Sequence, residues 1–437
     1  MDRTASSSNR WLAAGVLLAA ACGVRAQTAD TLTYDADEAP KKGQLVRPGP
    51  LPEPLGRLFP DLPWNFKETI TFKSDGFSMT PGLVTLVDFS EFDQDADSVR
   101  QLGIQESAWE TRAVRLILRG HIGEHYKVNY LWSVEYNDLK FLDTQLWQIP
   151  DLAFSFPLSA SGRTRLAVGK MKEAFAYEMV GDAANLPHQE RILNPFFQAR
   201  NIGAQLTHVS EDQHSTFRAG VFNDSRFETG TYDEGDWQVA TRATHLLLDE
   251  PEKGRYLHLG VAGRYFGATA DALRYRARPA SNVTSNFLDT GTFSADHAWH
   301  AGVEFLWNEG PFSLLAEFNQ AWVTSGAAGD PTFFGGYLTA GWVLTGESRP
   351  YDRTVGYARR VMPKGRWGAP ELIARMAHLD LSDARAQGGE LDRLAIGLNW
   401  WATRRWKLGV EWGRSWVDRD AINSTTDAVL ARMQWVF

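Results

Sequence analysis

The sequence predicts an all-β protein, a transmembrane antiparallel β-barrel of about 16 to 18 strands. Three observations predict this class: an export leader, aromatic residues at both ends of alternating segments, and a last segment that alternates up to Phe437. The leader's apolar run of about a dozen residues is too short to span a bilayer, and no later run approaches the roughly 18 residues of a spanning helix. A helical membrane protein is therefore not expected.

The first 26 residues have the features of a secretory signal peptide. Two arginines precede an apolar stretch from Trp11 to Cys22, and small residues before the cut at Ala26 suit cleavage. A lipoprotein cleavage box before Cys22 is the alternative, but Ala19 stands in it where a larger aliphatic residue is usual. Cys22 is the only cysteine, so a chain cleaved after residue 26 has no disulfide and no thiolate chemistry.

Residues 27–64 are predicted to form a Pro-rich periplasmic linker, because seven prolines lie between Pro40 and Pro63 without strand or helix periodicity. Residues 65–437 are predicted to form the barrel. The chain has a formal net charge of −8, which argues against nucleic acid as a partner. Its 12% aromatic residues, 17 of them tryptophan, suit the two interfaces of a barrel in outer-membrane lipid.

Alternation of apolar and polar residues predicts membrane-facing strands. Segments 127–137, 406–413 and 428–437 show it most clearly. In the second segment, Trp406 and Trp412 stand at the two ends of the apolar face, as in an aromatic girdle. A soluble β-sandwich gives similar alternation and is the alternative, but the leader and the girdle spacing favour the barrel.

The strand that ends on Phe437 resembles the closing strand that the barrel-assembly machinery recognises in outer-membrane proteins. A sheet in lipid cannot leave an edge of unpaired amides, so the first and last strands are expected to pair. Segment 66–73 is the predicted partner, with Ile70 and Phe72 on one face. At about ten residues per strand, the chain after the linker supplies 16 to 18 strands, and a barrel of that size encloses water.

Several stretches resemble the phosphate-selective porins O and P. Residues 168–175 read V-G-K-M-K-E-A-F, where that family has V-G-x-F-K-x-P-F, and 341–351 contain its W-x-L-T-G-E-x-R-x-Y signature. The resemblance covers 165–205 and 334–437 well. It implies a homotrimeric channel in the outer membrane of Gram-negative bacteria, with a constricting loop folded into the barrel, that passes phosphate or polyphosphate. The chain departs from the family at 174–182, which leaves the loop shape and the solute open.

An anion channel needs fixed positive charge where its passage is narrow. If alternate apolar residues face lipid, the basic residues predicted to face the lumen are Arg115, Arg119, Lys127, Arg218, Arg264 and Arg375. The resemblance adds basic residues in the region that the family folds into its constricting loop, namely Lys170, Lys172, Arg191 and Arg200. Glu135, Glu371 and Glu411 are predicted to face inward too, so pairing with an acid is the alternative role for each basic residue.

Motifs for catalysis or metal binding are incomplete. Residues 188–190 have the H-x-E spacing of a zinc deaminase, but no cysteine ligands accompany them. Asp93, Asp95 and Asp97 begin like a calcium loop, yet Ser98 replaces the required glycine. No enzyme activity, cofactor or metal is therefore predicted. A diffusion channel for other solutes and a surface enzyme or adhesin carried on a barrel stay open as alternatives.

Overall fold

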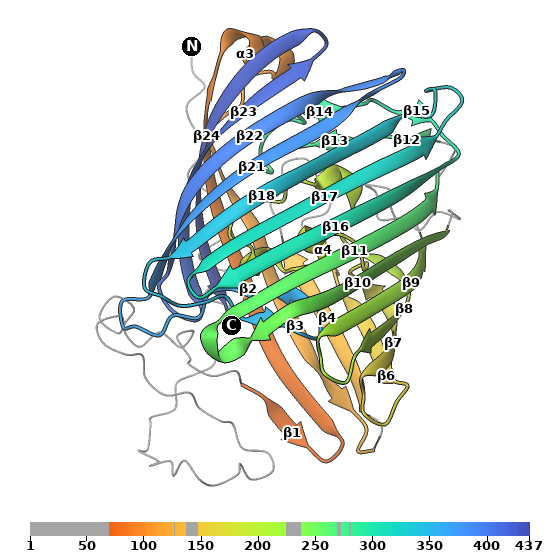
Figure 1. Ribbon diagram of the computed structural model, residues 1–437, viewed down its shortest axis with the longest axis vertical. Coiled ribbons are helices and arrows are strands. Elements are labelled where there is room, and N and C mark those ends of the chain that lie inside the picture. The colour runs from red at the N-terminus through yellow and green to blue at the C-terminus, as the bar shows by residue number, and fades with distance from the viewer. Residues whose placement is uncertain (1–69, 126, 137–146, 224–236, 269–271, 279–280) are drawn as a thin grey trace, which may run out of the picture. The chain divides into compact units, whose positions relative to one another are not determined.

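The computed structural model describes residues 70–125, 127–136, 147–223, 237–268, 272–278 and 281–437. Within these ranges eighteen strands form one antiparallel sheet, and sixteen of them close into a barrel, as predicted (Figure 1). The predicted leader and linker lie outside the described residues. The barrel strands are β2 (Phe77–Gln94), β3 (Ala108–Ile122), β4 (Val128–Tyr136), β6 (Leu152–Pro157), β7 (Thr164–Met171), β8 (Asn201–Val209), β9 (Ser215–Asn223), β10 (Trp237–Glu250), β11 (Arg255–Gly267), β16 (His297–Glu309), β17 (Phe312–Thr324), β18 (Thr332–Val343), β21 (Ala369–Asp383), β22 (Ala386–Trp401), β23 (Trp406–Arg419) and β24 (Ile422–Val436).

Smaller elements decorate this ring. Two short strands extend the sheet, β1 (Phe72–Ser74) beside β2 and β5 (Trp147–Gln148) beside β4. Three small hairpins are β12 (Ala272–Leu273) with β15 (Phe293–Ser294), β13 (Arg276–Ala277) with β14 (Leu288–Asp289), and β19 (Tyr351–Asp352) with β20 (Tyr357–Ala358). The helical turns are α3 (Ala96–Leu102), α4 (Tyr177–Val180), η1 (Ala183–Asn185), η2 (Asn194–Phe196) and η3 (Pro251–Lys253). No helix in the described ranges has the length and apolar character needed to cross a membrane.

The barrel closes where β24 pairs with β2, from Val436 opposite Val84 to Thr426 opposite Gln94. The first and last barrel strands therefore pair, but the partner segment is 77–94, and the prediction of 66–73 was wrong. The turn at Gly76, with φ +68°, folds the chain back, so that β1 is only a short strand along the foot of β2.

The two ends of the barrel differ in their connections. Short turns such as η3 join the strands at the lower end in Figure 1, and longer loops such as the one with α3 join them at the upper end. Because outer-membrane barrels have short periplasmic turns and long extracellular loops, we call these the periplasmic and the extracellular end. One periplasmic connection is long, residues 344–368 between β18 and β21.

Side chains alternate between the lipid face and the lumen as predicted. On β23, Val410 is 55% exposed on the outer face, whereas Lys407 and Glu411 are buried on the inner face. Apolar outer residues recur along the other strands and give the barrel its apolar outer surface.

One side of the lumen is filled. The connection between β7 and β8, residues 172–200, folds inward, which confirms the predicted constricting loop. Its buried aromatic residues belong to one apolar cluster with the wall formed by β9, β11 and β18, and this cluster includes Phe175, Tyr177 and Phe196 with Phe222, Phe266 and Phe333. The open passage is therefore confined to the opposite side, along β2, β3 and β4.

Candidate functional site

The inward loop (residues 172–200) is fastened to the wall by carboxylates that lie beneath it. The backbone N–H groups of Tyr177 and Glu178, at the start of α4, donate to the carboxylate of Glu317 on β17 at 2.8 and 3.2 Å. Glu178 in turn accepts from Arg375 on β21 at 2.9 Å. Buried charges that are paired and hydrogen-bonded fix a loop in one position.

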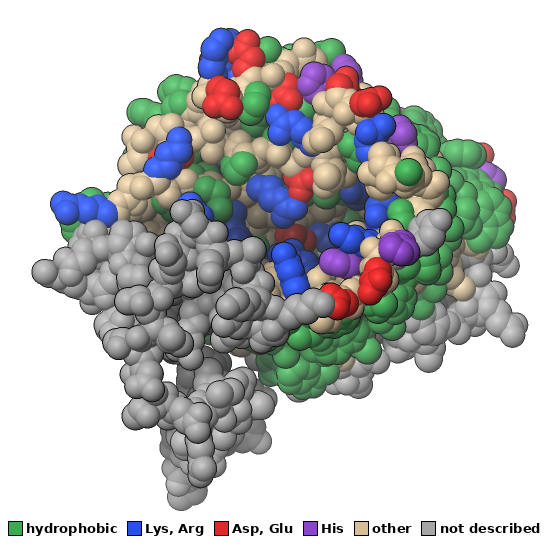
Figure 2. Space-filling view, turned by 90° about the horizontal axis from the view of Figure 1, so that it is seen from below, with side chains coloured by type: hydrophobic (Ala, Val, Ile, Leu, Met, Phe, Trp, Pro, Cys, Tyr) green, Lys and Arg blue, Asp and Glu red, His purple; other side chains and the backbone are tan. Residues whose placement is uncertain are grey.

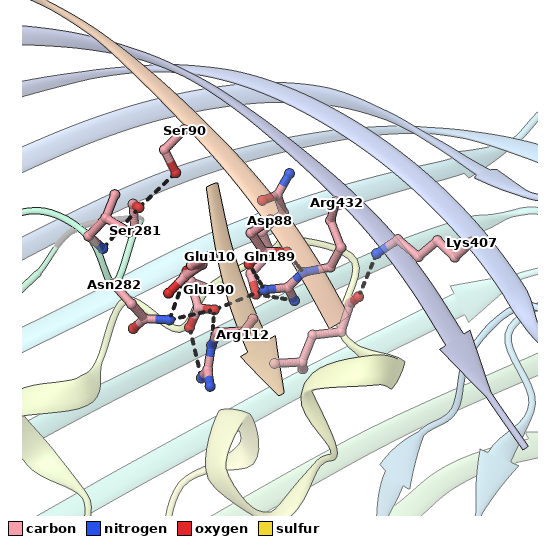
Figure 3. Close-up of polar contacts among 12 residues, drawn as sticks. Asp88, Ser90, Glu110, Arg112, Gln189, Glu190, Ser281, Asn282, Lys407 and Arg432 are labelled. Atoms are coloured by element: carbon pink, nitrogen blue, oxygen red, sulfur yellow. Dashed lines mark hydrogen bonds and ion pairs between the residues drawn. The ribbon is translucent and has the colours of Figure 1, made fainter. Parts of the chain in front are cut away.

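Glu190 fastens the far part of the loop to three other elements (Figure 3). Its carboxylate accepts from Arg112 on β3 at 2.6 Å, from Arg432 on β24 at 2.9 Å and from Asn282 of the β13–β14 connection at 3.2 Å. Burial alone would raise the pKa of Glu190, but the guanidinium groups of Arg112 and Arg432 outweigh it and lower this pKa to about 2. The carboxylate is therefore charged at neutral pH.

A second segment enters the lumen from the periplasmic end and meets the inward loop. We call residues 344–362 the periplasmic insert. Arg349 donates to Glu371 on β21 at 3.0 Å and to the carbonyl oxygen of Asn185 at 3.2 Å. The Asn185 amide donates to the Tyr357 hydroxyl at 3.0 Å. The W-x-L-T-G-E-x-R-x-Y signature thus supplies, through Arg349, a contact that positions this insert.

The two inward segments and the wall of β2, β3, β4 and β7 enclose a cavity of about 790 Å³. Eleven of its lining residues are Lys or Arg, and three are Asp or Glu. Seen from the periplasmic end, Lys and Arg side chains gather around the hollow (Figure 2). The basic lining residues are Arg112, Arg115, Arg119, Lys170, Lys172, Arg191, Arg200, Arg353, Arg359, Arg360 and Arg405, and the acidic ones are Glu135, Asp182 and Asp352.

The cations of the cavity fall into two groups. Several pair with a carboxylate, as Arg115 does with Glu135 at 2.6 Å and Arg200 with Asp151 at 2.8 Å. Others form no ion pair with any residue that the structure describes, and these are Arg119, Lys170, Arg191 and Arg360. The cavity therefore keeps a surplus of positive charge in a chain of net charge −8.

Burial and neighbouring charges shift the pKa values of the ionisable loop residues at the cavity. Burial lowers the pKa of Lys172 to about 8, although Asp182 accepts from its ammonium group at 2.8 Å. Burial likewise lowers the pKa of Arg191 to about 10, and it stays charged at neutral pH. Burial would raise the pKa of Asp182, but the ammonium of Lys172 keeps it below its usual range.

Six of the ten predicted basic residues line the cavity, namely Arg115, Arg119, Lys170, Lys172, Arg191 and Arg200. For Lys170 and Lys172 strand alternation was ambiguous. At Gly169 the backbone has φ +127°, which breaks the alternation just before Lys170. A Cβ there would lie 2.1 Å from the carbonyl oxygen of Leu152, so only glycine fits this bend.

The other four predicted residues lie elsewhere. Arg264 and Arg375 face inward but are buried in ion pairs with Glu173 and Glu178 under the inward loop. Arg218 donates to the carbonyl oxygen of Thr354 in the periplasmic insert at 3.1 Å. Lys127 is exposed in the turn before β4, because the strand begins only at Val128.

Sequence reasoning missed five basic lining residues, and each lies off the regular strand pattern. Arg112 stands at a β-bulge, where Leu86 and Val87 pair with Ala113 and Thr111 and skip it. In the sequence, the only sign of this bulge is that the outward apolar residues of β3 change from odd positions, such as Trp109, to even positions, such as Val114. The others lie in the insert or in a turn, namely Arg353, Arg359, Arg360 and Arg405.

The two incomplete metal motifs serve as structural contacts. His188 lies with Nδ1 2.6 Å from Glu411 on β23. Asp95 caps α3 by accepting from the Ser98 backbone at 2.6 Å and also accepts from the Thr425 backbone at 2.7 Å. Among the described side chains, no group of three His, Cys, Asp or Glu is placed to hold a metal ion.

Comparison with known proteins gives a family match over most of the chain. The family model described as phosphate-selective porin O and P matches residues 86–437. A curated relative from Caulobacter vibrioides, described as an uncharacterized protein, is 36% identical over 157 residues. That match covers 33% of this chain and only 31% of the relative's own length.

Solved structures share the fold at low sequence identity. OmpT of Vibrio cholerae has a TM-score of 0.52 and 9% identity, covering 84% of this chain and 99% of that chain. OprB of Pseudomonas putida has a TM-score of 0.50 and 9% identity, with 83% and 94% covered. The outer membrane channel DcaP of Acinetobacter baumannii has a TM-score of 0.50 and 12% identity, with 84% and 99% covered.

Proposed function

Because the chain belongs to the family of phosphate-selective porins O and P, and is thus an outer-membrane porin, we propose that its channel passes small anions, with phosphate or polyphosphate as the solutes. One observation carries this proposal. A chain of net charge −8 places eleven Lys or Arg and only three acidic residues around a cavity of about 790 Å³. The surplus charge lies between the inward loop and the wall of β2, β3, β4 and β7.

The physical role of these cations is to replace part of the water that an anion loses on entry. Field lines from fixed charges are concentrated by the low-dielectric wall, so local charge, rather than net charge, sets the cost of entry. A guanidinium group presents several N–H donors in one plane and stays charged at any physiological pH, which suits the oxygens of phosphate. Arg119 and Arg360, which pair with no described carboxylate, are the groups we expect to act most directly.

Ion flow through purified protein in a planar bilayer tests the proposal. In a gradient of potassium chloride the reversal potential should show anion preference, and phosphate at low concentration should block or replace the chloride current. A cation preference would refute the anion assignment, and an anion preference without any effect of phosphate would favour the general diffusion channel. Well-folded protein without conductance would refute passage itself.

Two neutral variants locate the selectivity. Arg119→Gln combined with Arg360→Gln should reduce anion preference, because both cations line the cavity without an ion pair to described residues. Lys127→Gln combined with Lys253→Gln is the matched control, since it also removes two positive charges, but from exposed positions in turns. Equal shifts of the reversal potential in both proteins would mean that the cavity cations do not set selectivity.

We also infer that the protein is a homotrimer, because neighbouring strands in one part of the barrel wall are short. Strands β6, β7 and β8 have only 6, 8 and 9 residues. A strand needs about 9 to 11 residues to cross a bilayer, so the shortest of them do not cross it alone. Neighbouring copies that cover this low wall remove the mismatch. Cross-linking of the protein in native membranes should yield trimers, and a monomer there would contradict the inference.

A further inference from the structure

The outer surface of the barrel near its periplasmic end carries a row of tryptophans at the feet of neighbouring strands. Trp342 on β18 is 45% exposed, and Trp406 and Trp435 lie side by side on β23 and β24 with ring centres 6.3 Å apart. Trp400 stands at the foot of β22, opposite Pro370. Such a row marks the level of the lipid headgroups, because indole rings collect at the membrane interface.

A short segment of chain, Pro363 to Gly368, passes along this row. The Trp400 indole Nε1 donates to the carbonyl oxygen of Trp367 at 2.8 Å, which places the segment beside an outward-facing side chain. Gly368 has φ +78°, and a Cβ there would lie 2.5 Å from the carbonyl oxygen of Trp401. The segment is therefore packed directly on the foot of β22. Trp367 itself is 59% exposed.

Three exposed cations lie on this segment or in the turn between β22 and β23, which Gly368 approaches at Ala402, and they lack the ion pairs of other cations on this rim. Lys364, Arg366 and Arg404 are exposed, and within the described part of the chain none of them forms an ion pair. Elsewhere on the same rim, Lys253 pairs with Glu250 at 3.0 Å and Arg255 with Glu309 at 2.6 Å.

The Arg366 guanidinium lies 5.8 Å from the centre of the Trp367 ring. A cation stacked on an interfacial indole has its charge at headgroup height and its apolar partner at the level of the glycerol backbone. Unpaired cations at that height attract anionic headgroups. The surplus charge here is separate from that of the channel, since none of these three residues lines the cavity.

We propose that Lys364, Arg366 and Arg404, with Trp367 and Trp400, form a binding site for an anionic phospholipid of the periplasmic leaflet. The cations contact the headgroup phosphate, and the two indoles contact the glycerol region and the upper acyl chains. Continuity with the tryptophan row commits the site to a membrane lipid, since a soluble anion makes no use of the exposed rings.

Native mass spectrometry of the full chain tests the site. Protein is released from bilayers that contain equal amounts of phosphatidylglycerol and phosphatidylcholine, and the retained lipids are counted. Wild-type protein should retain phosphatidylglycerol preferentially. The triple variant Lys364→Gln, Arg366→Gln and Arg404→Gln should lose this preference, by roughly fivefold for each cation removed.

The matched control removes three other cations from the same end, Lys127, Arg163 and Lys253, each changed to Gln. Preference that survives in the control and is lost in the first variant supports the site. Equal loss in both variants, or no preference in the wild type, would overturn it. Conductance measured on the same preparations should be unchanged in the first variant, so a failure of the lipid site is distinguishable from a failure of the channel. If the triple variant does not fold, Arg404→Gln alone against Lys253→Gln gives the same comparison.

Discussion

Arg432 should be among the most costly single side chains to remove, because it ties the closing seam of the barrel to the inward loop. It lies on β24 directly opposite Asp88 on β2, in the register that closes the barrel. Its Nε and Nη2 donate to the two carboxylate oxygens of Asp88 at 2.7 and 2.5 Å, and Nη2 also donates to Glu190 at 2.9 Å (Figure 3). Nη1 donates to the carbonyl oxygen of Gln189 at 2.7 Å.

The expected magnitude follows from burial. Arg432 is 2% exposed, so Arg432→Leu would leave Asp88 without its ion-pair partner and Glu190 with only Arg112 and Asn282 as donors, both away from water. Removing one partner of a buried ion pair typically costs about 3 to 5 kcal/mol. Arg255→Leu is the matched control, since Arg255 and Glu309 are also opposite each other on adjacent strands but are about one-third exposed. That change should cost far less, because water screens the charges of an exposed pair.

Urea unfolding in lipid vesicles, followed by tryptophan fluorescence, measures both free energies of unfolding. Adding Asp88→Asn to Arg432→Leu should recover part of the loss, because the carboxylate of Asp88 is then no longer a buried charge without a partner. Single-channel recordings should show a larger and noisier conductance for Arg432→Leu, since the loop loses a contact at Gln189 and another at Glu190. Equal stability of Arg432→Leu and Arg255→Leu would refute this reasoning.

Two further predictions concern the cavity wall. Burial lowers the pKa of Lys172 to about 8, so this side chain is charged below that pH and neutral above it. Anion preference, read as a reversal potential, should therefore weaken as the pH rises from about 7 to about 9, and a Lys172→Met channel that weakened equally would contradict the assignment. Gly169→Ala should destabilise the barrel by about 1 to 3 kcal/mol, because φ is +127° and the new Cβ meets a carbonyl oxygen at 2.1 Å. The control is Gly263→Ala, where the nearest atom is 3.7 Å away; urea unfolding should show little change there, and equal losses at both sites would argue against strain at Gly169.

The fold was predictable because alternation records which side of the wall a residue occupies. On β23 the pattern placed Lys407 and Glu411 inside and Val410 outside, and the structure agrees. The pattern fails wherever the backbone leaves the regular pleat. The bulge at Arg112 and the bend at Gly169 each shift the phase, and neither has a signature strong enough to be read from a single sequence.

The cavity was predictable only in part, because half of its enclosure comes from chain that is not strand. Arg353, Arg359 and Arg360 lie on the periplasmic insert, and their position depends on the contacts of Arg349 with Glu371 and with Asn185 of the inward loop. Contacts between segments distant in sequence leave no periodic signal. The family resemblance singled out residues 341–351 as a signature. It did not predict that the chain after β18 folds into the lumen.

A chain of net negative charge can enclose a positive cavity because several of its buried acids pair with the arginines that hold the inward loop. Glu178 and Glu190 belong to that loop and accept from arginines of the wall, and Glu317 on β17 accepts from two of the loop's backbone N–H groups. The charges of Glu178 and Glu190 are compensated locally by Arg375 and Arg432, which hold the loop in place. The cations that face the passage have fewer such partners, so the same loop that narrows the channel also separates the charge that makes it favourable for anions.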